Sequence, residues 1–269
     1  TAFSAFTASF ILATVIFFGK LPVILLLIGF AIFTLLRTHA FHKRKTAEKE
    51  KKDSLKETET YQSVLVDCDN EVKSAVIRIS KLLFLTYNGF AKEKLKDIKD
   101  TKKQSKKLNK EIKHIKESLP DTLKKFQESD IESGHFYVQV IDHLKETTNS
   151  LSHIIQPAFT HLDNNHPLDH EQSQELKEFN EMTNEFFNFA ISMFQKRSFE
   201  KMNELILKKD VVIEQINEII KNRIKILKKT QKGSKVSITY IDMLTETKNL
   251  ISHVVQLIKA TSNMSERSR

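Results

Sequence analysis

Residues 141–156 read IDHLKETTNSLSHIIQ, and residues 241–256, one hundred positions further along the chain, read IDMLTETKNLISHVVQ. The two stretches align without a gap and share nine of their sixteen positions. In the numbering of the first copy, the shared residues are Ile141, Asp142, Leu144, Glu146, Thr147, Asn149, Ser152, His153 and Gln156. A repeat at a fixed offset indicates a duplicated structural unit.

Apolar residues at helical spacing surround both copies, over the whole of residues 56–262. Five glycines and four prolines in 269 residues leave little room for the many turns of a β-sandwich or barrel. The turn-forming segment DNNHP at 163–167 divides the helical region into 56–163 and 168–262. We therefore predict an all-α fold with two related three-helix bundles. The buried stripe predicted for the first copy is Ile141, Leu144, Leu151 and Ile155.

The first 36 residues contain one charged residue, Lys20, between two apolar runs. The sequence GKLP at 19–22 favours a turn, so we predict a transmembrane helical hairpin over residues 1–36. A single tilted span with Lys20 reaching the interface is the alternative. The basic linker at 37–55 predicts an integral protein of the inner cell membrane, in contact with the lipid bilayer and with residues after about 40 on the cytoplasmic side. Because Thr1 opens inside an apolar run, we expect more chain upstream.

The formal net charge of +9 raises the question of nucleic-acid binding. The lysines of 92–127 alternate with acidic residues, and the chain has no Trp and four Tyr, so a solvated helix face is favoured and no nucleic-acid partner is expected. No Gly-rich phosphate loop is present, and Ser152 and His153 would point about 100° apart on a helix. The sequence therefore predicts a protein that is not an enzyme. The single cysteine, Cys68, cannot form an internal disulfide.

The shared polar residues of the repeat lie on one helix face, at spacings of four, three and four. Two carboxylates one turn apart can hold a divalent or trivalent cation, with amide or imidazole ligands beside them. The other interpretation is structural, with the acidic residues paired to lysines of the next helix. The candidate metal ligands are Asp142, Glu146, Asp242 and Glu246, with Asn149, His153, Asn249 and His253 as further ligands.

This duplicated acid-xxx-acid helix resembles the PhoU fold, in which the third helix of each half carries an E/D-x-x-x-D motif. The resemblance implies metal binding at the four acidic residues, with iron, zinc or manganese as the metal. The second acid is Glu in both copies, and the Gly that often precedes it is replaced by Lys145 and Thr245. The sequences YVQVIDHLKE at 137–146 and HLDNNH at 161–166 resemble the PhoU-like tail of bacterial inorganic phosphate transporters of the PiT type.

These resemblances imply the C-terminal part of an inorganic phosphate transporter, with the helical tail as a cytoplasmic regulatory module. Phosphate and a coupling cation would then bind to a transport domain upstream of Thr1, and we also expect a homo-oligomer. Two alternatives are a membrane-anchored helical sensor protein and a sodium-coupled phosphate symporter of another family with a PhoU-like tail. The sensor would need sustained heptads or an ATP-binding domain with Gly-rich boxes, and the 100-residue repeat and the five glycines argue against both. Only upstream sequence could separate the two transporters.

Overall fold

The computed structural model describes residues 61–126, 131–164, 168, 170–196, 199–229 and 234–267, and every regular element in this part of the chain is helical. The predicted all-α class is therefore confirmed. Residues Thr60–Arg269 form one compact unit, so the predicted division into bundles at 56–163 and 168–262 stays a prediction. The helices are α2 (Tyr61–Ala91), α3 (Leu95–Glu117), α4 (Leu119–Leu123), α5 (Ile131–Asp163), α6 (His170–Lys196), the 3-10 turn η2 (Phe199–Lys201), α7 (Met202–Lys229) and α8 (Ser234–Arg267).

A left-handed residue separates α2 from α3. Glu93 has φ 53°, and the backbone N–H of Lys94 donates to the carbonyl of Gly89 at 2.8 Å, which closes the end of α2. At the other end of α3, the chain leaves the helix after Glu117 and re-enters one at Leu119, with Pro120 in the first turn of α4. The lysine-rich segment is thus one long helix followed by a short one.

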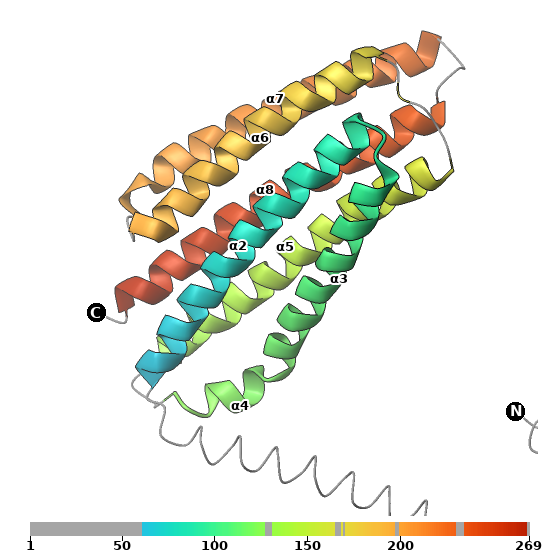
Figure 1. Cartoon of the computed structure of the whole chain (residues 1–269). Helices are drawn as coiled ribbons and strands as arrows, with labels where there is room; N and C mark the ends of the chain where they lie inside the picture. Colours follow the sequence, from blue (N-terminus) through green and yellow to red (C-terminus); the bar gives the residue numbers. More distant parts are fainter. Residues whose placement is uncertain are drawn as a thin grey trace, which may run out of the picture. The chain divides into compact units, whose positions relative to one another are not determined.

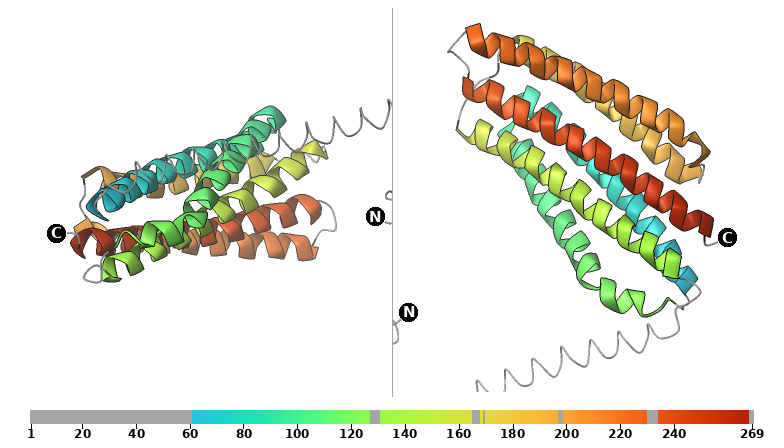
Figure 2. Two further views of the ribbon diagram at one scale, coloured as in Figure 1. Left: turned by 90° about the horizontal axis from the view of Figure 1, so that it is seen from below. Right: turned by 180° about the vertical axis from the view of Figure 1, so that it is seen from behind.

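The two copies of the repeat lie side by side in the middle of the domain. The most extensive helix–helix contact joins α5 and α8, which run antiparallel in Figures 1 and 2. On one side α3 packs against α5, and on the other α7 packs against α8. The helix α2 contacts α3, α5 and α6, so it joins the first set of three long helices to the second.

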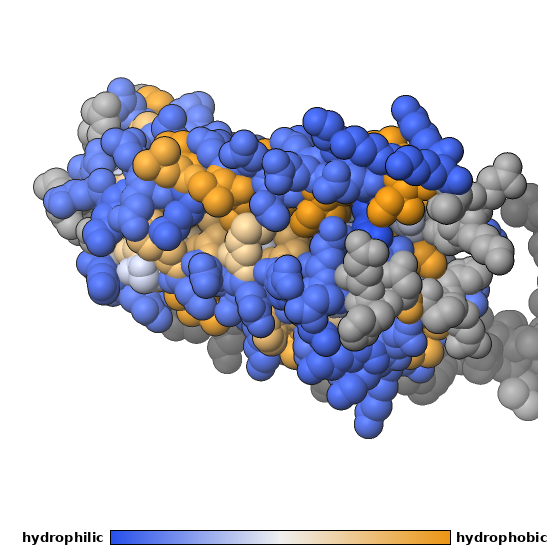
Figure 3. Space-filling model, turned by 90° about the horizontal axis from the view of Figure 1, so that it is seen from above, coloured by the Kyte–Doolittle hydropathy of each residue, from blue (hydrophilic) through white to orange (hydrophobic). Residues whose placement is uncertain are grey.

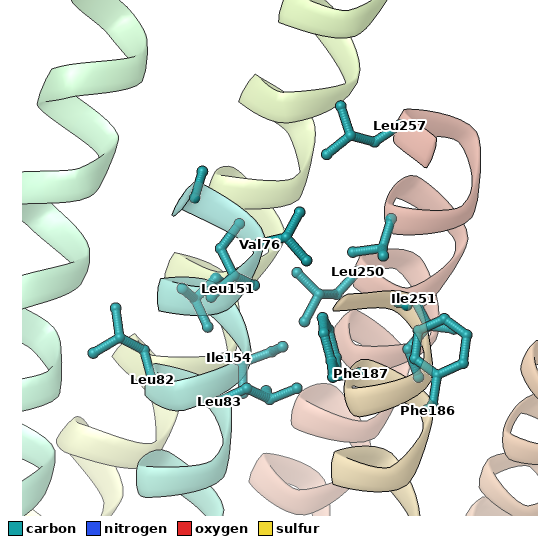
Figure 4. Packing of buried hydrophobic residues seen from close by; sticks show 14 of the residues in the cluster. Val76, Leu82, Leu83, Leu151, Ile154, Phe186, Phe187, Leu250, Ile251 and Leu257 are labelled. Carbon is teal, nitrogen blue, oxygen red and sulfur yellow. The ribbon is translucent and has the colours of Figure 1, made fainter. Parts of the chain in front are cut away.

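The hydrophobic core contains residues from both copies and from the helices around them. The predicted stripe of the first copy is confirmed, because all four of its side chains are at most 1% exposed. Burial of one such side chain stabilises the fold by roughly 1.5–3 kcal/mol. Figure 4 shows α2, α5, α6 and α8 converging on the residues Val76, Leu82, Leu83, Leu151, Ile154, Phe186, Phe187, Leu250, Ile251 and Leu257.

One buried polar contact also joins α2 to α8. The Tyr87 hydroxyl lies 2.6 Å from the Thr247 hydroxyl and donates to the Met243 carbonyl at 3.2 Å. Tyr87 and Thr247 are both 0% exposed. Because buried hydroxyl groups need hydrogen-bond partners, this contact helps to fix how α2 lies against α8.

The surface is polar with apolar residues between the charged ones. Figure 3 shows apolar residues along the middle of one long face, between hydrophilic margins. On α7, Leu207 is 66% exposed and Val211 is 61% exposed, one turn apart. Exposed apolar side chains in small numbers are usual for a folded protein.

The predicted localisation in a membrane is wrong on this structure. Helices such as α5 are long enough, but none in the described residues is apolar enough over its length to cross a bilayer, because polar and charged side chains line the face opposite each buried stripe. The predicted hairpin at 1–36 and the basic linker at 37–55 lie outside the described residues.

Candidate functional site

The first acidic pair lies on α5 beside the lysine-rich helix α3. Asp142 is half-exposed, and its carboxylate accepts a hydrogen bond from the Lys116 ammonium at 2.9 Å. This hydrogen bond raises the pKa of Lys116 above its usual value, and the nearby charge of Glu146 acts in the same direction. Glu146 is exposed and accepts a longer hydrogen bond, 3.4 Å, from the Asn149 amide. The first pair therefore has a basic partner on α3.

The second acidic pair lies on α8, where antiparallel packing brings it to the first copy. Glu246 is half-buried, and its carboxylate lies 3.8 Å from Nδ1 of His153 on α5. Asp242 and Asn249 are exposed. The structure thus brings two of the predicted ligands together across the seam between α5 and α8, although they come from different copies of the repeat.

A third feature of this seam is a histidine neighbourhood near the first pair. Burial lowers the pKa of His143, the nearby His253 lowers it further, and Asp142 acts in the opposite direction. His143 and His253 are both half-buried. His143 is therefore mainly neutral at neutral pH, which makes it a hydrogen-bond donor or acceptor and not a fixed charge.

The eight predicted ligands do not form a compact cluster. Over the residues that the structure describes, no group of three or more His, Cys, Asp and Glu side chains is placed so that it could hold a metal ion. Asp142 and Glu246 instead have basic partners, Lys116 and His153. Binding of iron, zinc or manganese at these residues stays a prediction.

Sequence reasoning missed a polar network between α3 and α5. The Asn109 amide nitrogen donates to the Ser152 hydroxyl at 2.9 Å, and its oxygen accepts from Lys145 at 2.5 Å. Lys145 occupies the position where the PhoU motif often has Gly, and burial lowers its pKa. No signal within one helix could have shown this, because the contact depends on the register of α3 against α5.

A buried ion pair between α6 and α7 was also missed. The Arg223 side chain is 3% exposed, and its guanidinium donates to one Glu175 oxygen at 2.6 and 3.0 Å. The Arg223 guanidinium carbon lies 5.7 Å from the centre of the Tyr240 ring on α8. Arginine on the apolar stripe of α7 was the available signal, since arginine is rarely buried without a partner.

Two hollows lie between helices of the domain, one between α2 and α3 and the other between α5 and α8. A groove of about 660 Å³ between α2 and α3 is lined by Glu71, Arg78 and Glu111 among others, and Arg78 and Glu111 form an ion pair along it. Burial raises the pKa of Glu71, and Asp67 adds to this effect. A smaller hollow of about 260 Å³ lies between α5 and α8, next to His143.

Comparison with known proteins supports the fold. Neither the family models nor the curated proteins give a match. Among solved structures, the phosphate transport system regulatory protein PhoU from Streptococcus pneumoniae is similar, with a TM-score of 0.63 and 10% identity over 77% of this chain and 97% of that one. PhoU from Pseudomonas aeruginosa gives a TM-score of 0.55 and 11% identity over 77% of this chain and 96% of that one.

These likenesses define the class of protein by its architecture. The chain has a PhoU-like fold, as the duplicated helix predicted. At 10–11% identity the likeness concerns the fold alone, and it does not extend to the predicted PiT-type transporter.

Proposed function

We propose that this chain regulates the transport of inorganic phosphate through its PhoU-like domain. The observation that carries the proposal is the match to two PhoU structures over nearly their whole length, one of them described as a phosphate transport system regulatory protein. The repeat in α5 and α8 agrees with this, because each copy supplies the third long helix of one set of three.

The finer proposal concerns the regulated protein. Residues 137–146 and 161–166 resemble the tail of PiT-type transporters, so we propose that the regulated activity is phosphate uptake by a transporter of this type, coupled to a cation. This resemblance covers residues of α5 and the segment that follows it, and it is independent of the structural comparison.

The seam between α5 and α8 offers a way for such a module to change state. The Asp142–Lys116 ion pair joins α5 to α3, the contact of Glu246 with His153 joins α8 to α5, and both are partly exposed to solvent. A cation bound at the carboxylates would compete with these basic side chains and would favour a different packing of the helices. Such a ligand can shift the protein between two states only by binding one of them more tightly.

The proposal is tested by phosphate uptake in cells that carry or lack the gene. We expect deletion to change the rate of radiolabelled phosphate uptake and its response to phosphate starvation, while sulfate uptake stays the same. The Asp142→Ala, Glu246→Ala double variant should change the response in part, and Asp210→Ala, which removes an exposed carboxylate on α7, should not. Unchanged phosphate uptake after deletion contradicts the proposal.

Metal binding is measured separately. Elemental analysis of the purified chain is compared with the variant that has Asp142, Glu146, Asp242 and Glu246 replaced by Ala. Stoichiometric metal that disappears in the folded variant supports the ligand set. Equal metal content in both proteins, or none in either, contradicts the ligand set.

A further inference from the structure

The smaller hollow lies at one end of the α5–α8 seam and has an unusual lining. Its volume is about 260 Å³, below the roughly 300–1,000 Å³ of pockets for drug-sized ligands, so it suits a small ion with its water. Two lining residues come from α5 and the others from α8, which means that a ligand here would touch both copies of the repeat. The lining residues are Gln139, His143, Gln256, Lys259, Ala260 and Asn263.

The chemistry of this lining favours an anion. Lys259 carries a positive charge and three N–H donors, the amides of Gln139, Gln256 and Asn263 add further donors, and none of the lining residues is acidic. Asp142 is next to His143 in sequence, but its carboxylate is paired with Lys116 on α3. A metal cation would instead require carboxylate, imidazole or thiolate ligands gathered in one place.

The second copy of the repeat provides an internal comparison. At an offset of one hundred residues, His143 corresponds to Met243, which is 0% exposed, and Lys259 corresponds to Phe159, whose ring is covered by the Lys102 ammonium at 3.7 Å. Asn263 corresponds to Asp163. The amide of Gln256 is shared, since its counterpart is Gln156, but the basic residues His143 and Lys259 and the amide of Asn263 are replaced at the matching place by two apolar residues and one acidic residue. The basic character of the lining therefore does not follow from the duplicated framework.

We propose that this hollow binds a tetrahedral oxyanion, namely a phosphate group, through Lys259, His143 and the three amides. The charge and donors of the lining carry the oxyanion assignment, while the choice of phosphate over sulfate rests on the proposed function. Bound phosphate bridges α5 and α8, so it stabilises one packing of the two copies against the other. This gives the regulatory domain a way to sense the anion whose transport it regulates.

Calorimetric titration of the full chain tests the site, with sodium phosphate as the titrant at constant ionic strength. We expect saturable binding of one phosphate per chain, at least about tenfold weaker in Lys259→Ala and also weakened in His143→Met, which copies the residue of the second repeat. Lys235→Ala removes one exposed charge from the same helix outside the hollow and should bind as the wild type does. Circular dichroism confirms that each variant is folded; Lys259 is exposed, so its replacement should not disturb the core.

Further titrants separate the sources of the anion. Tighter binding of inorganic phosphate than of phosphoserine identifies the free ion, and the reverse order identifies a phosphorylated segment; both support the oxyanion site. Binding of sulfate without phosphate keeps the site but contradicts its connection to phosphate regulation, whatever the uptake assay shows. The absence of saturable binding by any of the three, or equal weakening in Lys259→Ala and Lys235→Ala, overturns the proposal.

Discussion

Thr147 and Thr247 occupy the same position in the repeat and are both 0% exposed, yet their hydroxyl groups make different contacts. The Thr147 hydroxyl donates to the carbonyl of His143 in its own helix at 2.6 Å. The Thr247 hydroxyl makes the matching bond to Met243 at 2.8 Å and also lies 2.6 Å from the Tyr87 hydroxyl on α2. Replacement by valine should therefore have a larger effect at Thr247.

The size of the difference follows from what each replacement leaves behind. Thr147→Val removes a bond to a carbonyl that is already part of the helix, so we expect a change of at most about 0.5 kcal/mol in the free energy of unfolding. Thr247→Val leaves the Tyr87 hydroxyl with only the longer contact to Met243, at 3.2 Å. A buried hydroxyl that loses a partner costs about 1–3 kcal/mol, so Thr247→Val should be less stable than Thr147→Val by at least about 1 kcal/mol.

Urea unfolding followed by circular dichroism measures this difference, and a thermal melt should show it as roughly 2–4 °C per kcal/mol. A double-mutant cycle with Tyr87→Phe isolates the contact. We expect the double variant to lose about 1 kcal/mol less than the sum of the two single variants. Equal losses at Thr147 and Thr247, or additive losses in the cycle, would refute the reasoning.

Three further predictions concern ionisable groups that are buried or half-buried. Glu175→Ala leaves the buried Arg223 guanidinium without this carboxylate and should lower the free energy of unfolding by about 3–5 kcal/mol; Arg223→Met should lower it less, because Glu175 keeps contact with water, and the reverse order in urea unfolding contradicts this. Burial raises the pKa of Cys68, so iodoacetamide should modify this thiol only after unfolding, as mass spectrometry would show; rapid reaction in the native state counts against it. The pKa of His143 is lowered below its ordinary 6.5, so the folded state binds this proton less readily than the unfolded state. The resulting loss of stability as pH falls below about 6.5 should be smaller in His143→Gln, measured by urea midpoints, and an unchanged pH dependence would argue otherwise.

The sequence was sufficient to predict the helices and their buried stripes, because both depend on spacing along one element. Residues 141–156 predicted a helix with four buried positions, and all four are buried in α5. The exact start of a helix could not be predicted in this way: the turn η2 precedes α7, which becomes α-helical at Met202, because helix ends depend on local capping that periodicity does not show.

The packing partners of the candidate site could not be predicted in the same way. The carboxylate of Asp142 lies beside Lys116 because α3 packs against α5 in one register, and a shift by one residue would rotate that lysine by about 100°. The contact of His153 with Glu246 depends likewise on α5 and α8 being antiparallel. Spacing within a helix shows which residues share a face, but it does not show what that face contacts.

The repeat also shows why shared residues are an incomplete guide to function in a duplicated protein. Asp142 has a lysine partner while Asp242 is exposed, and Glu246 contacts a histidine across the seam while Glu146 accepts a bond from its own helix. Identical side chains thus have different surroundings, because the helices that flank α5 and α8 differ in sequence. A ligand that contacts both copies therefore meets two different surfaces. The positions where the copies differ, such as His143 and Met243, are then the ones that can make the two copies bind such a ligand differently.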